Sequence, residues 1–396
     1  MKQNFLTQLP WMRRGKKYLV IEIMREYTRC TPYRIHSAEN KIVCGTPVMR
    51  SYSDARTSTV IDAVSELCRN VNKMGEYEII VSLDPMFATT IHAPVVLARE
   101  DSSIPVDVSD LDNRIGQGIW KVFDRERSRA ALKMSVNDLE VLPTDVRIKE
   151  VRLDGHKVIN PVGFHAQEIG MHVSQTFMPR LFAAELRHII PGNAVRLMGE
   201  NAVMEAEAIR RVVAPSSFLF LRVLDRNTIT TFTNEHGTVS VGSFPWGKND
   251  VVRTIGEVFS VSGSVAEEIL HRYNTNRMSK PVALRFSKVV EMAFAGLFEA
   301  MRAAYLTHSV PNIYLSINLA VPDIILSRKF TELINPRLSV TLIDAHHVAQ
   351  KLGLTIEPLG HRLDLGTFAP LVDFYFSHSD DTMSRIARRH ARWLVH

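Results

Sequence analysis

The sequence has no apolar run of about 18 residues, the length that a membrane-spanning helix needs, so we expect no segment that crosses a bilayer. It also has few cysteines. Cys30, Cys44 and Cys68 are an odd number, and their spacings fit neither a zinc site nor a CxxC redox pair. The opening residues carry their charges after their apolar residues, which is the reverse of a secretory signal. These absences predict a cytoplasmic protein in a reducing compartment.

Common enzyme motifs are missing as well. The chain contains no GxSxG nucleophile elbow, no HExxH zinc motif and no GxxxxGK[ST] P-loop. The formal net charge is +6, and basic residues gather at the two ends, with four between Arg13 and Lys17 and four between Arg385 and Arg392. No Arg/Gly-rich tract or aromatic-basic RNA-binding pattern lies between them. We therefore predict neither catalytic residues nor nucleic-acid binding.

The first part of the chain has the pattern of an α/β domain. Residues 18–24, YLVIEIM, predict a buried strand, and the next segment predicts a hairpin that turns near Asn40. Apolar residues from Val60 to Val71 recur on one helical face. A second buried strand, EYEIIVSLD, ends before Pro85. The order strand, hairpin, helix, strand is typical of α/β proteins.

A different module and a repeat follow. From about Val95 to Arg180, a long helix that begins at Ser109 or Asp110 precedes strands that alternate like a small half-buried sheet. After Pro191 the pattern of strand, hairpin and helix returns, beginning with the apolar run SFLFLRVL. The sequence therefore predicts two related α/β halves, with a small α+β insertion in the first.

The most specific stretch of the insertion is Asn160-Pro161-Val162-Gly163, which leads into a strand. In this order of elements the chain resembles FtsA, the actin-like protein of bacterial cell division, whose inserted subdomain carries an NPVG segment at this place. The resemblance runs from about Tyr18 to Leu326. It implies an α/β fold of duplicated actin-like (ribonuclease H-like) domains with a small FtsA-type α+β insertion in the first half. The PilM proteins of type IV pilus assembly share this fold and are the nearest alternative.

The resemblance also implies where the domains begin and end. The predicted parts are a basic N-terminal segment (1–17), a first actin-like domain (18–94 and 181–214), the FtsA-type insertion (95–180), a second actin-like domain with a reduced outer lobe (215–376), and a linker with a C-terminal amphipathic helix (377–396). The outer lobe is predicted to be reduced because only the short segment NTNRMSKP separates two of its helices.

Actin-like ATPases bind nucleotide with glycine-containing loops, because a Cβ would block the approach of the backbone or forbid its dihedral angles. This sequence has no glycine at the corresponding places. The residues of the three degenerate loops are Glu22, Met24 and Arg25, then Arg222, Asp225 and Thr228, and finally Ile317 and Asn318. We therefore expect a pseudo-ATPase without cofactor or metal. The alternative is an ATPase with rebuilt loops, in which Glu22 or Asp225 still holds a metal ion.

The C-terminal segment is the main positive feature. At helical spacing its apolar residues share one face and its arginines share the opposite face, the pattern of a helix that lies on an anionic membrane. FtsA ends in a linker and a helix of this kind, so the resemblance implies the same role here. The predicted membrane-contact residues are Met383, Arg385, Ile386, Arg388, Arg389, Arg392, Trp393 and Leu394. The alternative is a helix docked on the protein's own surface.

These features together predict a scaffold of bacterial cell division that lies on the inner face of the cell membrane and does not hydrolyse ATP. By resemblance, its partners are FtsZ or another cytoskeletal or division protein, further copies of itself in filaments or oligomers, and an anionic membrane surface. Two alternatives stay open. One is a PilM-like adaptor of pilus assembly, and the other is an actin-like ATPase with rebuilt loops.

Overall fold

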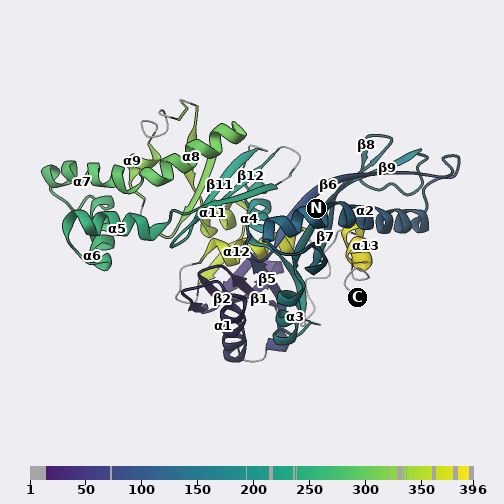
Figure 1. Ribbon diagram of the computed structural model, residues 1–396, viewed down its shortest axis with the longest axis horizontal. Coiled ribbons are helices and arrows are strands. Elements are labelled where there is room, and N and C mark those ends of the chain that lie inside the picture. The colour runs from purple at the N-terminus through teal and green to yellow at the C-terminus, as the bar shows by residue number, and fades with distance from the viewer. Residues whose placement is uncertain are drawn as a thin grey trace. The chain divides into compact units, whose positions relative to one another are not determined.

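The computed structural model describes residues 15–71, 74–192, 194–213, 217–234, 237, 239–319, 321–327, 332, 334–335, 337–358, 363–377 and 382–391. The chain divides into two compact units, which are Met1–Ala208 with Gly353–His396, and Ile209–Leu352. Figure 1 shows the elements of both units. Residues 1–14 of the predicted basic N-terminal segment lie outside the described part of the chain.

The first unit is built on a seven-stranded mixed sheet. Its strand order is β10-β5-β1-β2-β3-β16, and β4 pairs with β2. β1 runs antiparallel to β2 and parallel to β5, which is parallel to β10. The strands are β1 (Lys16–Ile23), β2 (Tyr27–His36), β3 (Lys41–Cys44), β4 (Val48–Ser51), β5 (Glu78–Leu83), β10 (Val195–Glu200) and β16 (Thr355–Pro358). The helices around it are α1 (Thr57–Asn70), α3 (Arg180–Ile189), α4 (Asn201–Arg210), α12 (Leu365–Ser377), η3 (Ser37–Glu39) and η4 (Met74–Glu76).

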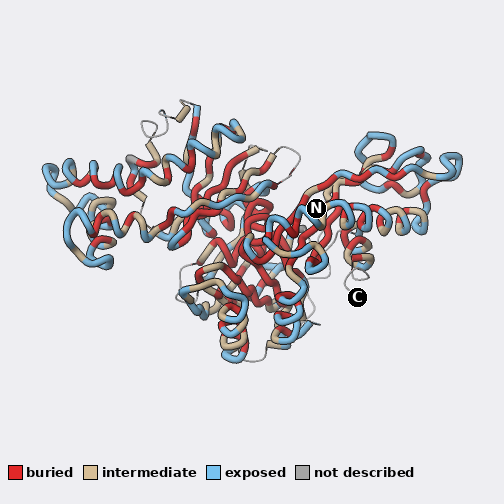
Figure 2. Tube along the Cα trace, in the orientation of Figure 1, coloured by how far each residue is buried: buried red, intermediate tan, exposed pale blue. Residues whose placement is uncertain are grey.

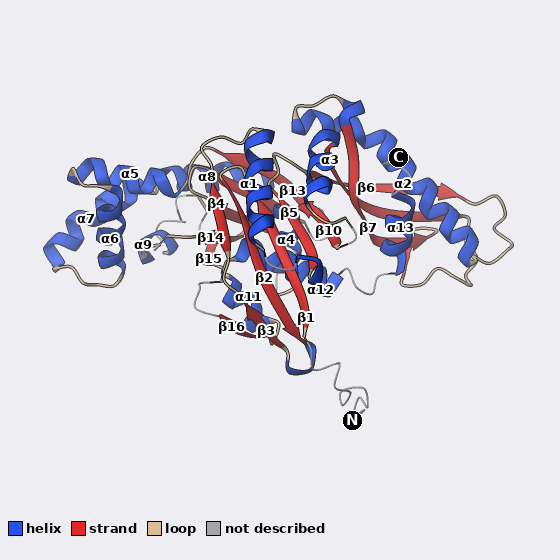
Figure 3. Ribbon diagram, turned by 90° about the horizontal axis from the view of Figure 1, so that it is seen from below, coloured by secondary structure: helices blue, strands red, loops and turns tan. Residues whose placement is uncertain are grey.

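The central strand β1 is buried on both faces, which explains why its sequence is apolar almost throughout. Leu19 and Ile21 belong to a core that includes residues of α1 and α3, and Figure 3 shows these two helices over the sheet. On the other face, Tyr18 contacts Phe374 of α12, with ring centroids 5.9 Å apart. Side chains on one face of β1 therefore pack against α1 and α3, and side chains on the other face pack against α12.

A four-stranded antiparallel sheet forms the insertion, in the order β6-β9-β7-β8. Its elements are β6 (Thr89–Ala98), α2 (Val108–Met134), η5 (Asp138–Glu140), β7 (Val141–Leu153), β8 (His156–Val158) and β9 (Glu168–Pro179). α2 alternates buried and exposed residues along its length (Figure 2). Its N-cap is Asp107, whose carboxylate accepts a hydrogen bond from the Asp110 amide at 2.6 Å. The predicted N-cap, Ser109 or Asp110, was thus two or three residues late.

The second unit contains a five-stranded sheet in the order β13-β12-β11-β14-β15. Its strands are β11 (Phe218–Val223), β12 (Thr228–Thr233), β13 (Val239–Phe244), β14 (Asn312–Ile317) and β15 (Ser339–Leu342). Its helices are α5 (Lys248–Phe259), α6 (Gly263–Asn274), α7 (Lys280–Ala293), α8 (Ala295–His308), α9 (Asp323–Leu326) and α11 (Ala345–Lys351). The stretch from α5 to α8, which is described throughout, contains helices and no strand.

Both units have the same strand order around their first strand. In each unit the first strand is antiparallel to the second, and the second and third strands form an antiparallel pair. The other neighbour of the first strand is parallel to it, β5 beside β1 in the first unit and β14 beside β11 in the second. The prediction of duplicated actin-like domains with mixed α/β sheets is therefore confirmed. The order β10-β5-β1-β2-β3 in the first unit matches the order β15-β14-β11-β12-β13 in the second. A mixed five-stranded order that occurs twice indicates duplication of one domain within the chain.

The predicted end of the second domain at residue 376 was wrong. The chain returns to the first unit at Gly353. β16 pairs with β3, with Thr355 opposite Lys41, and α12 packs on β1 and β5. The sequence TIEP is too short and too polar to identify as an edge strand of a sheet that began more than 300 residues earlier. β16 belongs to the first sheet because it pairs with β3, a contact between segments that lie far apart in the sequence.

Candidate functional site

The parallel strands β1, β5 and β10 end at one edge of the sheet, where the first degenerate loop was predicted. After β1 the chain turns at Met24, whose amide donates a hydrogen bond to the Tyr27 carbonyl at 2.8 Å. Arg25 in this turn donates to Asp84, from Nη2 to Oδ1 at 3.0 Å and from Nε to Oδ2 at 3.2 Å. Asp84 is fully buried. An arginine of this chain therefore compensates the acid at the end of β5.

Glu22 on β1 faces a second arginine. Arg29 of β2 donates from Nε to Glu22 Oε2 at 3.1 Å, and its Nη2 lies 2.5 Å from Asp364 Oδ1. Burial lowers the pKa of Arg29, but the charges of Asp364 and Glu22 outweigh burial and hold this pKa well above its usual value. Glu22 therefore belongs to an ion-pair network with Arg29 and Asp364.

The second degenerate loop follows β11, and its turn repeats the geometry of the first. The Leu224 amide donates to the Asn227 carbonyl at 2.8 Å. α5 begins against this turn, and the amides of Lys248 and Asn249 donate to the carbonyls of Leu224 and Asp225, at 2.9 Å and 2.8 Å. A phosphate at a helix N-terminus would need such amides. In this chain the amides of Lys248 and Asn249 already donate to the carbonyls of the turn.

The segment Gly242–Lys248 has the GxxxxGK spacing of a P-loop, but Asn249 stands where Ser or Thr is required. Gly247 lies against the turn, since a Cβ at this position would be 2.6 Å from the carbonyl oxygen of Asp225. Lys248 pairs with Glu267, with 2.8 Å between Nζ and Oε1. The glycine permits close packing of α5 on the turn and the lysine forms an ion pair, so this segment is not a phosphate cradle.

The remaining loop residues lie on the strands β11, β12 and β14 of the second unit or just after β11 and β14. Arg222 is buried on β11, and the hydroxyl of Thr228 donates to a backbone carbonyl at 2.8 Å. The side chain of Asp225 is exposed. Ile317 packs against the core of this unit at the end of β14, and Asn318 follows it. Among the residues that the structure describes, no group of three His, Cys, Asp or Glu side chains forms a metal site.

The NPVG segment forms a turn in the insertion. The side-chain oxygen of Asn160 accepts a hydrogen bond from the Val162 amide at 3.1 Å. Gly163 has a φ of 90°, a conformation that residues with a Cβ rarely adopt. Its amide donates to the Val106 carbonyl at 2.8 Å, which ties this turn to the loop before α2. The motif therefore has a structural role that accounts for its asparagine and its glycine.

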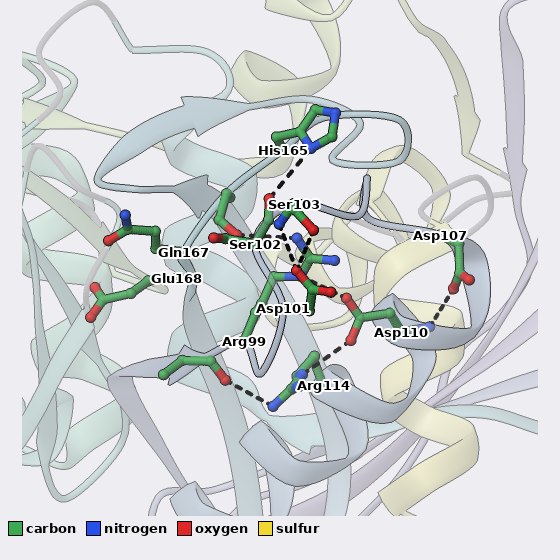
Figure 4. Close-up of polar contacts among 12 residues, drawn as sticks. Arg99, Asp101, Ser102, Ser103, Asp107, Asp110, Arg114, His165, Gln167 and Glu168 are labelled. Carbon is green, nitrogen blue, oxygen red and sulfur yellow. Dashed lines mark hydrogen bonds and ion pairs between the residues drawn. The ribbon is translucent and has the colours of Figure 1, made fainter.

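Polar contacts order the two loops beside this turn (Figure 4). Asp110 accepts from Arg99 Nε at 2.8 Å and from Arg114 Nε at 3.1 Å. Asp101 accepts from the amide and the hydroxyl of Ser103, at 2.8 Å and 2.6 Å. Each of these acids binds a group of the same chain. These hydrogen bonds join the residues of each loop to one another and to α2.

The C-terminal helix α13 (Thr382–Ala391) is amphipathic as predicted, but its apolar face is covered. Its apolar residues belong to or pack against the core of the insertion: Met383, Ile386, Ala387 and Ala391. Two arginines that were predicted to contact a membrane, Arg385 and Arg389, are exposed. Three other predicted contact residues lie outside the described part of the chain: Arg392, Trp393 and Leu394.

The position of α13 is the one that the alternative prediction gave, on the protein's own surface. A membrane contact through its apolar face requires the helix to leave this position. None of the helices in the described ranges is long and apolar enough to cross a membrane.

A groove of about 570 Å³ lies beside α13 in the first unit. It is bounded by the start of β7, the end of α3, the strand β10 and the last turn of α13. β10 is the end strand of its sheet, and β8 pairs with β7 only at Val151–Leu153. Within the described residues, β10 therefore has a neighbouring strand on one side only, and so has β7 before Val151. The apolar lining residues include Val146, Leu186, Ile190, Val195 and Leu197.

Arginines surround this groove. Arg187 is exposed, Arg196 lies 3.6 Å from a glutamate of β5, and Arg388 comes from α13. The acid among the lining residues is Asp145, which is buried and pairs with Arg147 at 2.8 Å. The lining thus holds three arginines and one acid, a formal excess of positive charge. The sequence analysis missed it, because its lining comes from three distant segments.

No family model matches this chain, and no curated protein matches it either. Solved structures do resemble it. A PilM-PilN type IV pilus biogenesis complex is 13% identical, with 96% of this chain and 99% of that chain covered and a TM-score of 0.44. A Bacteroides thetaiotaomicron protein with an actin-like ATPase fold is 7% identical, with 87% and 99% covered and a TM-score of 0.42. The cytoplasmic domain of EpsL, an inner membrane component of the type II secretion system of Vibrio cholerae, is 8% identical, with 91% and 95% covered and a TM-score of 0.34.

The fold is actin-like, and this assignment depends on the strand order that the two units share. The closer prediction, a divergent member of the FtsA branch, stays a prediction.

Proposed function

We propose that this chain is a protein-binding adaptor of the actin-like fold that acts beside a membrane and does not hydrolyse ATP. The observation that carries the proposal is the pairing of Arg25 with Asp84 and of Arg29 with Glu22 at the strand ends of the first unit. Mg²⁺ binds nucleotide phosphates together with protein carboxylates. Here the carboxylates at this edge are neutralised by arginines, and the turn lacks the glycines that phosphate loops need.

The first prediction concerns nucleotide. We expect no change in the Tm of the purified protein when millimolar ATP and Mg²⁺ are added, because arginines pair with the carboxylates at the strand ends of the first unit. A ligand at 100 times its Kd stabilises a native protein by about 2.7 kcal/mol, so real binding is easily seen in a thermal titration. Mg²⁺ alone is the control. A saturable rise in Tm would refute the pseudo-ATPase proposal and favour an ATPase with rebuilt loops.

The groove supplies the site for a protein partner. A chain segment in extended conformation can pair with an open strand edge through its main chain, while its side chains enter the pockets on either side. β10 offers such an edge, and the groove volume lies within the range of peptide and ligand sites. The arginines favour a segment that carries carboxylates. We propose that the partner presents a short extended segment with both apolar and acidic side chains.

The second prediction tests this site in cells. A photoreactive phenylalanine at Thr144, which is half-buried in the groove lining, is expected to form a covalent product with one main partner. The same residue at Leu306, an exposed position on α8 of the second unit, is the matched control. Adding Arg187→Glu to the Thr144 variant should lower the yield about tenfold, because a charge-assisted hydrogen bond contributes roughly 1.5–3 kcal/mol. Equal products from both positions would refute the groove as the site.

The identity of the partner in this covalent product distinguishes the cell-division role from the pilus-assembly role, both of which the sequence predicts. FtsZ or another division protein would support the FtsA-like scaffold. A membrane component of a pilus assembly would support the PilM-like adaptor. A second copy of the chain would support self-association through the groove.

A further inference from the structure

A second cavity of about 580 Å³ lies in the first unit, where the strands β1, β5 and β10 begin. Four of its eight lining residues are aromatic, namely Tyr18 of β1 and, at the end of α12, Phe374, Tyr375 and Phe376. We call this cavity the aromatic pocket. None of the described residues that line the groove beside α13 is aromatic. The two cavities therefore suit different side chains.

The α3 side of the groove and the aromatic pocket lie on opposite faces of the first unit's sheet. Leu186 of the groove lining belongs to α3, which packs on one face of the sheet together with α1. Phe374 of the aromatic pocket belongs to α12 and packs on the other face, with its ring centroid 5.9 Å from that of Tyr18. Arg196 lines both cavities. Both cavities therefore border β10, the end strand of the sheet.

A segment that adds to β10 as a further strand has side chains on both faces of the sheet, because neighbouring side chains of a strand point in opposite directions. One side chain then enters the groove, and the next one in sequence lies over the face that holds the aromatic pocket. Aromatic rings pack favourably against other aromatic rings, in offset or edge-to-face arrangements. We propose that the partner segment places an aromatic side chain in the aromatic pocket, beside an aliphatic side chain in the groove. This inference rests on the proposed function of the groove.

Arg196 supplies a charged contact between the two cavities. The distance from its Nε to Oε1 of Glu78 is 3.6 Å, which is longer than a hydrogen bond, and about half of the Arg196 side chain is exposed. Lys16, which is exposed, also lines the aromatic pocket, so its lining holds two cations and one acid. A carboxylate next to the aromatic residue of the segment can pair with Arg196 through a charge-assisted hydrogen bond. The partner segment therefore combines aliphatic, aromatic and acidic side chains.

Cross-linking from both cavities tests whether one segment occupies them. A photoreactive phenylalanine at Phe376, whose side chain is 40% exposed, probes the aromatic pocket in cells, and the Thr144 variant probes the groove. Mass spectrometry of the cross-linked peptides identifies the partner residues. We expect both positions to capture the same protein, at residues no more than about four positions apart, because a strand rises only about 3.3 Å per residue and both cavities border Arg196.

The outcomes separate this inference from the proposed function. A product from Thr144 alone, two different proteins, or two distant sites on one protein would overturn the inference and leave the groove as the partner site. The absence of any product from Thr144 would refute the proposed function, and the inference with it.

A binding measurement with the purified full chain then tests the aromatic contact itself. The probe is a synthetic peptide of the captured segment, and a second peptide has alanine in place of its aromatic residue. We expect Phe376→Ala to weaken binding of the first peptide at least tenfold, because buried aromatic side chains contribute strongly at interfaces. Phe259→Ala is the matched control, since Phe259 on α5 of the second unit is 43% exposed.

The second peptide shows whether the loss comes from this contact. It should bind the native chain as weakly as the first peptide binds Phe376→Ala, and Phe376→Ala should cause no further loss, because both changes remove the same contact. Losses that add, or equal binding of the first peptide by the native chain and Phe376→Ala, would overturn the inference.

Discussion

Replacing Arg147 with alanine is expected to lower the free energy of unfolding of the first unit by about 3–5 kcal/mol. Arg147 on β7 lies between two carboxylates, with Nε 2.8 Å from Asp145 and Nη1 2.7 Å from Asp373 of α12. Burial lowers the pKa of Arg147, but the charges of Asp373 and Asp145 outweigh it and raise the pKa further above its usual value. Without the arginine, two buried carboxylates face each other without their shared cation.

Urea unfolding of the purified chain measures this effect. Arg272→Ala is the matched control, because Arg272 pairs with Glu268 on the exposed side of α6 at the same 2.8 Å. Exposed pairs of this kind contribute about 0–1 kcal/mol. A variant with Asp145→Asn, Arg147→Met and Asp373→Asn is expected to recover part of the loss, since it leaves no uncompensated charge. A loss below about 1 kcal/mol for Arg147→Ala would show that the carboxylates find other compensation.

The same triad explains how the insertion is joined to the body of the first unit. Lys149, two residues further along β7, pairs with Glu207 of α4 at 2.7 Å. Arg147 joins β7 to α12, and Ser384 joins it to α13. Buried charged pairs contribute more to specificity of arrangement than to stability in several systems. In this chain they link β7 to α4, α12 and α13, three elements that lie far from it in sequence.

The fold could be predicted because its strongest signals are local. A strand buried on both faces, such as β1 or β11, must be apolar almost throughout, and the sequence shows this directly. The order of strand, hairpin and helix recurs, so duplication was visible from the pattern. The return of the chain at Gly353 was not visible, because β16 is only four residues long. Its assignment depends on pairing with β3, which no local pattern encodes.

The candidate sites could be predicted only in part. The lack of glycine at the loops after β1 and β11 is visible in the sequence, and a turn follows each of these strands. The residues that form ion pairs beside the turn after β1 could not be predicted from the sequence. Arg25 and Asp84 are separated by 59 positions, and Arg29 and Asp364 by 335. The amphipathic pattern of α13 was visible, but such a pattern does not distinguish a membrane from the protein's own core as the surface that covers it.

The last prediction concerns Glu200, which lies at the end of β10 and is almost fully buried. Its Oε2 accepts a hydrogen bond from the Thr90 amide at 2.5 Å. Burial raises the pKa of Glu200 to about 7, and the hydrogen bonds of Thr90 oppose this shift only in part. In the unfolded chain a glutamate has a pKa of about 4.3. Between these two values the native protein holds a proton that the unfolded chain releases.

Stability must therefore fall as the pH rises through this window. The native state binds more protons than the unfolded state between about pH 4.3 and 7, so the contribution of Glu200 is present below this window and is lost by its upper end. At about 1.4 kcal/mol for each pKa unit, the total change is roughly 4 kcal/mol. Glu200→Gln keeps an oxygen for the Thr90 amide and cannot ionise. The variant should gain this amount over the native chain between pH 4 and pH 8.

Comparing the native chain with Glu200→Gln separates the effect of Glu200 from that of other titrating groups. Burial lowers the pKa of His92 to about 3, and this shift has the opposite sign, because a histidine with a lowered pKa makes the protein more stable as the pH rises. His92 is present in both proteins and cancels in the difference between their free energies of unfolding. Urea unfolding at a series of pH values gives that difference. A difference that stays constant from pH 4 to pH 8 would mean that Glu200 ionises as easily in the fold as in water, which its burial forbids unless the end of β10 opens to solvent.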